Sequence, residues 1–167
     1  MFIGHYAIAL AAKKAAPKTS LGTLFLATQL IDLLWPIFLL MGLEHVRIDP
    51  GNTVVTPLDF YDYPITHSLV GCVGWAIGLG ILYWILRRDW RAGWVVGGLV
   101  LSHWVLDAIA HRPDLPIFPG GGYLVGFGLW NSLAATLAVE LGMFAAGSAI
   151  YLHSTQSQDR VGRYGLL

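Results

Sequence analysis

Residues 92–111 read AGWVVGGLVLSHWVLDAIAH. A helix that crosses the hydrocarbon core of a membrane needs about 20 predominantly apolar residues, and this stretch meets that length. Its ionisable residues are His103, Asp107 and His111, each four positions after the one before. On a helix this spacing places the three side chains in one stripe on one face. The stretch therefore predicts a membrane helix that carries a polar stripe.

Other parts of the chain have the same apolar character. Residues 20–42, 65–86 and 129–152 are each long enough to span a bilayer, although the glycine-rich residues 120–128 blur the start of the last one. Residues 2–16 are short for a span, so we expect a tilted helix or a half-span that rests on its neighbours. The sequence thus predicts an all-α fold, an integral membrane helical bundle of four or five transmembrane helices, as a single domain over residues 1–167.

The composition supports a bilayer as the solvent. Of the 167 residues, 56% are hydrophobic and 12% are charged, against about 25% charged residues in a typical soluble domain. A soluble domain of this size could not hide so much apolar surface. A net charge of zero argues against a nucleic-acid partner. The expected partner is the lipid bilayer, while the oligomeric state stays open.

Basic residues alternate between the loops. The loops between the second and third and between the fourth and fifth apolar segments hold only Arg47 and Arg112. The other basic residues follow the first, third and last apolar segments; they are Lys13, Lys14, Lys18, Arg87, Arg88, Arg91, Arg160 and Arg163. Cytoplasmic loops concentrate Lys and Arg. We therefore expect a cytoplasmic C-terminus and two loops, 43–64 and 111–128, on the extracytoplasmic side. The lysines follow the first apolar segment instead of preceding it, which argues against a cleaved signal.

Glycine spacing suggests where helices approach each other. Gly74 and Gly78 lie four residues apart, and so do Gly93 and Gly97. Small residues at this spacing let membrane helices pack closely. General tolerance of glycine in membrane helices is an equally good interpretation of the pattern.

Several ionisable residues lie inside the apolar segments. Each costs roughly 2.5–3.5 kcal/mol at the centre of a membrane helix, so a compensating interaction is expected. Asp32 and His103 are each about 16–18 Å from the cytoplasmic ends of their segments at ~1.5 Å per residue. Imidazole and carboxylate together suit Zn²⁺, with Mn²⁺ or Fe²⁺ as alternatives. The candidate metal ligands are His5, Asp32, His67, His103 and Asp107.

Each of these residues also has a plainer interpretation. A single histidine in a membrane helix is usually an interhelical hydrogen-bonding group, which applies to His5. An acid such as Glu140 is more often a lone buried acid or a partner for a polar neighbour than a catalytic group. The loop acids Asp59 and Asp62 are expected to face water, with a position over the mouth of the cavity as the alternative for either.

Four short patterns are similar to those of a known family. They are His5, Asp32, Thr66-His67-Ser68, and Ser102-His103 followed by Asp107. In this order they resemble the bacterial inner-membrane metal-dependent hydrolases, over the chain from His5 to about Asp114. The resemblance implies a multi-pass protein of the inner (plasma) membrane that hydrolyses its substrate with a bound metal. Leu34 and the stretch Tyr63-Pro64-Ile65 depart from the family pattern, so the resemblance does not extend to a second metal.

A hydrolytic function would give roles to further residues. The metal would activate a water molecule against an ester or phosphoester, with a lipid or lipid-linked substrate suggested by the location. Asp107 or Glu140 would act as the general base, and His111 would protonate the leaving group or bind phosphate. Arg112 would pair with a phosphate group, and Ser68, next to His67, is a candidate substrate contact.

Two other classes of function stay open. Buried His, Asp and Glu residues at graded depths are also what a metal-ion or proton transporter or channel requires. A transporter needs access from both sides, whereas an enzyme site can be closed toward the cytoplasm. A non-catalytic membrane protein, in which the polar cluster only fixes helix packing, is the third interpretation.

Overall fold

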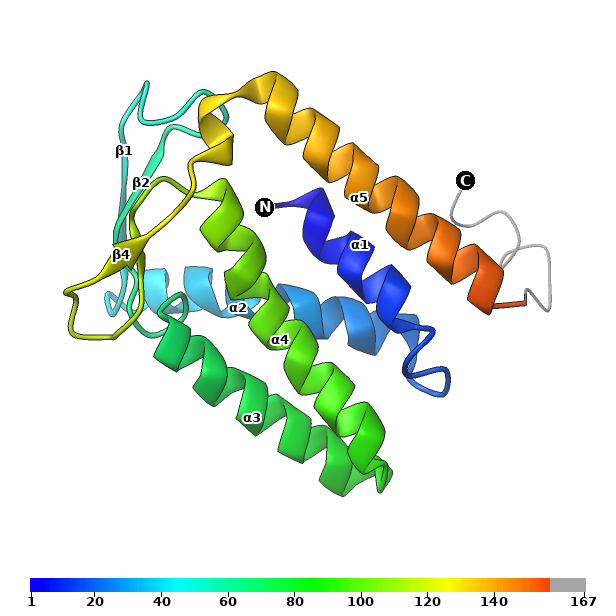
Figure 1. The fold of residues 1–167 in the computed structure, drawn as a ribbon. Helices are drawn as coiled ribbons and strands as arrows, with labels where there is room; N and C mark the ends of the chain where they lie inside the picture. Colours follow the sequence, from blue (N-terminus) through cyan, green and yellow to red (C-terminus); the bar gives the residue numbers. More distant parts are fainter. Residues whose placement is uncertain (157–167) are drawn as a thin grey trace.

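The computed structural model describes residues 1–156, which form five α-helices with two small β-hairpins (Figure 1). The predicted all-α architecture is confirmed. The cytoplasmic C-terminus predicted from Arg160 and Arg163 lies outside the described residues. The helices are α1 (Ile3–Ala12), α2 (Leu21–Leu40), α3 (Leu69–Arg87), α4 (Trp90–Ala110) and α5 (Leu133–Ser154), with a 3-10 turn η1 at Leu129–Asn131.

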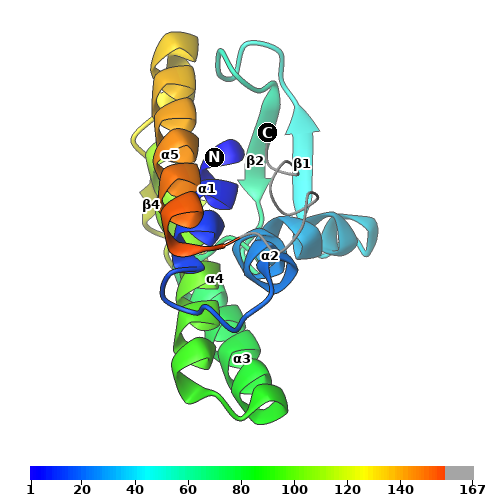
Figure 2. The same cartoon turned by 90° about the vertical axis from the view of Figure 1, so that its right-hand side faces the viewer.

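Four helices, α2 to α5, are long and apolar enough to cross a membrane. Helix α1 has 10 residues, which gives about 15 Å of rise, or half of a ~30 Å hydrocarbon core. It packs against α5, α2 and α4 (Figures 1 and 2), as expected for a half-span supported by its neighbours. The chain is therefore a multi-pass membrane protein.

Each long helix begins at a residue whose side chain accepts a backbone N–H. This satisfies one of the amide donors that a helix leaves unpaired in its first turn. The final helix begins at Leu133, later than expected, because Ser132 caps it after the 3-10 turn. The capping residues are Ser20, Ser68, Asp89 and Ser132.

Helix α4 is the centre of the bundle. It packs against α3, α2 and α1. In its membrane-crossing stretch 56% of the residues are buried, against 28% or less in the other three long helices. Helices α3 and α4 run antiparallel and meet at glycines: a Cβ on Gly97 would lie 2.8 Å from the Ala76 carbonyl oxygen, and one on Gly80 2.9 Å from that of Gly93. These contacts let the two backbones touch. Gly74 and Gly78, by contrast, have open space around them.

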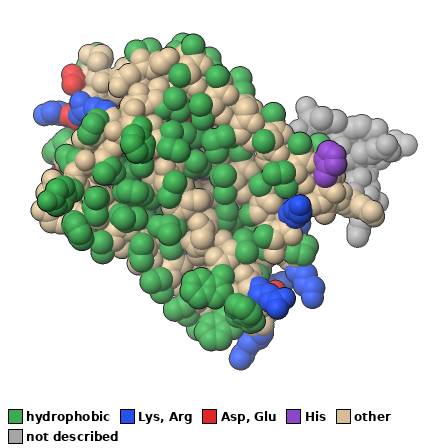
Figure 3. Space-filling model, in the orientation of Figure 1, with side chains coloured by type: hydrophobic (Ala, Val, Ile, Leu, Met, Phe, Trp, Pro, Cys, Tyr) green, Lys and Arg blue, Asp and Glu red, His purple; other side chains and the backbone are tan. Residues whose placement is uncertain are grey.

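Two β-hairpins lie at one end of the bundle and were not expected from the sequence. Strand β1 (His45–Ile48) pairs antiparallel with β2 (Leu58–Asp62), and β3 (Leu115–Pro116) pairs with β4 (Leu124–Val125). The α1–α2 loop and the α3–α4 turn lie at the opposite end (Figure 1). Figure 3 shows a largely hydrophobic surface, with most of the visible Lys and Arg side chains at that opposite end. The two groups of loops that differ in basic charge are thus at different ends.

Candidate metal centre

Five polar side chains from four parts of the fold converge inside the bundle. We call them the His–Asp cluster: His5 on α1, Asp32 on α2, His67 just before α3, and His103 and Asp107 on α4. The four residues other than Asp32 are buried. All five predicted metal ligands are therefore brought together, since His5, His103 and Asp107 form one group of donors and Asp32, His67 and His103 form another.

The histidine nitrogens and the carboxylate oxygens of the cluster face each other. His103 Nε2 lies 3.0 Å from Asp107 Oδ2 and 3.4 Å from Asp32 Oδ1. His67 Nε2 lies 3.5 Å from the same Asp32 oxygen and 3.8 Å from Asp107 Oδ2. His5 Nε2 is 3.3 Å from Asp107 Oδ1. His103 links the two groups because it belongs to both.

The ring of His103 is oriented by the backbone of α2. Its Nδ1 donates to the carbonyl oxygen of Thr28 at 2.7 Å. A neutral imidazole that donates from Nδ1 presents an unprotonated Nε2. That Nε2 is buried and faces Asp107 Oδ2 at 3.0 Å without an aligned hydrogen bond, so it points into the cluster. In metal-binding histidines, the ring nitrogen that does not face the metal usually donates to a carbonyl oxygen or a carboxylate, as His103 Nδ1 does here.

His67 is oriented in the same way by a side chain. Its Nδ1 lies 2.7 Å from Thr66 Oγ1, and the Thr66 hydroxyl donates to Glu44 Oε2, also at 2.7 Å. Because the hydroxyl hydrogen points to Glu44, its oxygen accepts from His67, which leaves His67 Nε2 as the free acceptor. Glu44 Oε1 further accepts the N–H groups of Ile65 and Thr66. Glu44 is buried, so this chain of contacts is fixed within the bundle.

His5 is held by stacking instead of hydrogen bonding. Its ring is parallel to that of His103, with centroids 3.9 Å apart and an interplanar angle of 4°. Both ring nitrogens are buried; Nδ1 has no polar partner among the described residues, and Nε2 has Asp107 Oδ1 at 3.3 Å without an aligned hydrogen bond. Asp107 Oδ1 also contacts the main-chain nitrogen of Met1. A buried imidazole nitrogen without a partner is costly unless something in the native protein pairs with it.

Glu44→Gln is expected to weaken metal binding without removing a ligand. Outer contacts of metal-binding histidines typically contribute 10–100-fold in affinity, and we expect a loss in that range for zinc, because the neutral amide cannot replace both charge-assisted bonds to Thr66. Zinc titration of the purified protein measures it. The control is Asp49→Asn, which neutralises an exposed loop acid. Unchanged zinc affinity in Glu44→Gln would contradict the orienting role of Glu44.

His111 and Arg112 belong to a separate network beneath the hairpins. His111 Nδ1 lies 3.0 Å from Asp114 Oδ1, and its ring packs on Trp130 with centroids 4.4 Å apart. Arg112 pairs with Asp59 and Asp114. Both side chains are already engaged by protein groups, so the structure gives no support to the predicted phosphate-binding and proton-donor roles. The expectation that Asp59 faces water is wrong: it is buried between Arg112 and Arg47.

Tyr63 connects this network to the cluster. Its hydroxyl donates to Asp114 at 3.1 Å, and its ring centroid lies 4.9 Å from that of His67. Burial, together with the negative charge of Asp114, raises the pKa of Tyr63 well above its ordinary value. The hydroxyl therefore stays protonated and acts as a donor.

Glu140 and Ser68 have capping roles. The two oxygens of Glu140 accept the N–H groups of Phe2 and Ile3, at 3.1 and 2.6 Å, at the start of α1. Ser68 Oγ accepts the N–H of Gly71 at the start of α3. These bonds explain both residues without the predicted general-base and substrate-binding roles. Glu140 thereby holds α1, and with it His5, against α5.

Residues that orient the cluster were not identified from the sequence. Glu44 closely follows the apolar segment that forms α2, a position typical of an ordinary loop acid. The sequence marks Thr66 only as part of Thr66-His67-Ser68. The signal was present, because a hydroxyl next to a candidate ligand is suited to orient it, but the pairing with Glu44 spans 22 residues and depends on the fold.

Comparison with known proteins returned no matching family model, no matching curated protein and no matching solved structure. The interpretation of the cluster therefore rests on its own geometry and chemistry.

Proposed function

We propose that this chain is a membrane-embedded hydrolase that binds a divalent metal in the His–Asp cluster and cleaves an ester or phosphoester of a lipid-linked substrate. One observation carries the proposal. Buried Nε2 atoms of His5 and His103 face the carboxylates of the cluster without an aligned hydrogen bond, and the opposite nitrogen of His103 is fixed by Thr28. This arrangement supports a cation held between the imidazoles and the carboxylates.

The spacing of neighbouring donors, in each of the two groups that share His103, is compatible with a small cation. Ligand atoms about 2.0–2.2 Å from a tetrahedral zinc are separated from each other by roughly 3.3–3.6 Å. The nitrogen–oxygen distances in the cluster, 3.0 to 3.8 Å, bracket that range. Imidazole with carboxylate favours Zn²⁺, and Mn²⁺ or Fe²⁺ accept the same donors. Such an ion supplies Lewis acidity and makes water a nucleophile near neutral pH.

Asp32 marks the accessible side of the cluster. Its side chain is 40% exposed, whereas those of His5, His67, His103 and Asp107 are 5% exposed or less. A substrate that approaches from α2 would meet Asp32 first. The neighbouring Leu33 and Ile37 are exposed and apolar, which supports a substrate that comes from the lipid phase. We assign to Asp32 the holding of the metal on its open side, next to the substrate.

The apolar core supports an enzyme over a transporter. Residues packed between the cluster and the end that carries the α3–α4 turn are largely aliphatic, and the buried polar side chains of α2 before Asp32 are Thr28 and Gln29. An ion path across the membrane needs polar groups along its length. The core cluster includes Ala9, Leu24, Ala27, Ile31, Val96, Leu99 and Val100.

The loosely paired nitrogens of the cluster argue against a purely structural role. Buried polar networks that only fix packing have their donors and acceptors satisfied. His5 Nδ1 has no polar partner among the described residues, and the Nε2 atoms of His5 and His103 face Asp107 oxygens at 3.3 and 3.0 Å without an aligned hydrogen bond. We further propose an inner-membrane location in which the end with the basic loops is cytoplasmic, because Lys and Arg concentrate on that side. The cluster then opens toward the extracytoplasmic half.

Hydrolysis can be tested with the purified protein. We expect detergent-solubilised protein loaded with zinc, manganese or iron to cleave a member of a panel of fluorogenic carboxylic and phosphate esters with acyl tails. Asp32→Asn is expected to lower the rate at least about 100-fold, because the substrate-side ligand is lost. Asp49→Asn, in an exposed loop, is the matched control and should keep the wild-type rate.

The rivals give different results in the same preparation. A transporter would bind metal but cleave none of the esters. It would also carry metal into proteoliposomes, and Asp32→Asn would abolish that flux. This combination of results would replace the hydrolase by a transporter. Cleavage that persists after chelation and in Asp32→Asn would reject the assignment of the site.

A further inference from the structure

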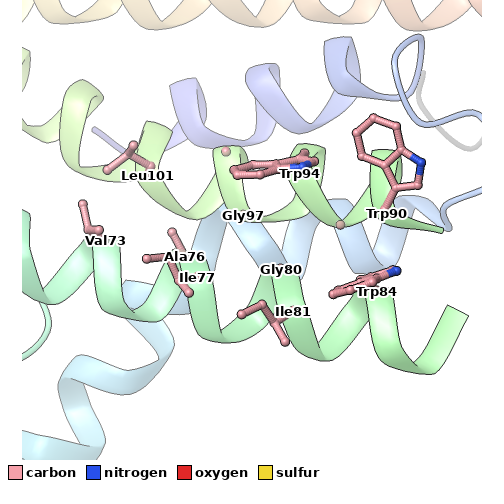
Figure 4. Close-up of a pocket in the computed structure, with 12 residues that line it drawn as sticks. Val73, Ala76, Ile77, Gly80, Ile81, Trp84, Trp90, Trp94, Gly97 and Leu101 are labelled. Carbon is pink, nitrogen blue, oxygen red and sulfur yellow. The ribbon is translucent and has the colours of Figure 1, made fainter. Parts of the chain in front are cut away.

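An apolar groove runs along the outside of the bundle between α3 and α4. Its volume is about 690 Å³, within the usual size range of small-molecule sites. Gly80 and Gly97, where the two backbones touch, lie along its floor, and Figure 4 shows aliphatic side chains such as Val73 and Leu101 at one end. The groove does not contact the His–Asp cluster, whose side chains face the interior of the bundle.

Three tryptophans line the other end of the groove. Figure 4 shows Trp84, Trp90 and Trp94 together there, near the α3–α4 turn. All three are exposed, Trp94 at 76%. Tryptophan is enriched at the level of lipid headgroups, where its ring contacts acyl chains and its N–H faces the polar region. These residues therefore place this end of the groove at the membrane surface.

The turn beside the tryptophans carries concentrated positive charge. Arg87, Arg88 and Arg91 are exposed, and none forms an ion pair with another residue in the described part of the chain. The Arg91 guanidinium lies over the Trp90 ring, 5.5 Å from its centroid. The one acid in the turn, Asp89, accepts the N–H of Ala92 at the start of α4. The end of the groove is thus a cationic site at headgroup level.

We propose that this groove binds an anionic phospholipid, with an acyl chain between α3 and α4 and the phosphate on the arginines of the turn. Arginine is well matched to phosphate because its planar donors form paired hydrogen bonds. A second copy of the chain is a poorer occupant. A twofold partner on the same groove would bring its own three arginines against these, and like charges would repel.

The test compares two lipids that differ only in the headgroup. Native mass spectrometry of the detergent-solubilised protein, titrated with dioleoyl-phosphatidylglycerol or dioleoyl-phosphatidylcholine, measures the tightest lipid site. We expect a clear preference for phosphatidylglycerol, and each Arg→Gln change at 87, 88 and 91 should reduce it by about fivefold. The triple variant, which changes only exposed side chains, should bind the two lipids nearly equally.

A second pair of variants tests the groove itself. A Cβ on Gly98 has open space around it, so Gly98→Leu fills the groove without a backbone clash. It should weaken binding of both lipids at least tenfold. Gly78→Leu is the matched control, since Gly78 is equally unobstructed on α3 but does not line the groove. Equal affinity for the two lipids in the wild type, or equal effects of the two leucines, would overturn the proposal. A dimer that Gly98→Leu dissociates, with lipid binding unchanged, would also overturn it and assign the groove to a second copy.

Discussion

Asp107→Asn is expected to abolish zinc binding, with a loss in affinity of at least about 100-fold. Asp107 is the residue that joins the cluster: its two oxygens lie within 3.0 to 3.8 Å of nitrogens from His5, His67 and His103. Asparagine keeps the shape but removes the negative charge. Equilibrium dialysis against zinc, followed by elemental analysis, should find about one ion per chain in the wild type and close to none in the variant.

The loss must be separated from a loss of folding. Asp49→Asn makes the same chemical change in an exposed loop and should retain the ion. Zinc at about 100 times its dissociation constant should stabilise the wild type by about 2.7 kcal/mol, and we expect no such shift for folded Asp107→Asn. His103→Ala should behave like Asp107→Asn, whereas the exposed His45→Ala should not. Wild-type protein that takes up none of zinc, manganese or iron would contradict the metal centre, and equal metal content in all variants would contradict the ligand assignment.

The fold and the cluster were predictable because both follow from periodicity. A bilayer requires spans of known length, so the apolar segments predict four or five membrane helices. His103 and Asp107 were grouped by their spacing of four residues, which holds in any helix. Asp32 is predicted to lie near His103 because the two residues are at similar depths along helices that cross the same slab. Each step used a regular rise per residue, and the structure brings these side chains together.

What the sequence did not predict lies in irregular segments. The chain from Glu44 through Thr66 to His67 depends on how the loop after α2 returns beside the start of α3. No periodicity applies to such a loop. The same holds for Asp59, which is buried because the β1–β2 hairpin brings it against Arg112. A loop between membrane helices that folds into a hairpin can bury its own polar residues, so such residues need not face water.

Glycine spacing predicted close packing at only one of two places. Gly93 and Gly97 contact α3, whereas Gly74 and Gly78 have open space around them. The spacing of four marks a face of a helix but does not say whether that face meets a neighbour or lipid. The tightest approach between two helices involves Gly147, which the pattern does not single out. A Cβ there would lie 2.3 Å from the carbonyl oxygen of Ala7.

Gly147→Leu is therefore expected to separate α1 from α5. The clash is with backbone, which no rotamer change relieves, so we expect the free energy of unfolding to fall by about 3 kcal/mol or more. Displacement of α1 would also withdraw His5 from the cluster and the N–H groups of Phe2 and Ile3 from Glu140. Thermal unfolding in detergent and zinc titration on the same samples measure the two effects.

Gly142→Leu is the matched control for this experiment. Gly142 is on the same helix, and a Cβ there has open space around it. It should leave both stability and zinc affinity near wild-type values, since an added apolar side chain on that face meets only the surrounding lipid or detergent. If Gly147→Leu proved as stable as Gly142→Leu, the close approach of α1 and α5 would be wrong. If it lost stability but kept full zinc affinity, His5 would not be a ligand, and the metal would be held by Asp32, His67, His103 and Asp107.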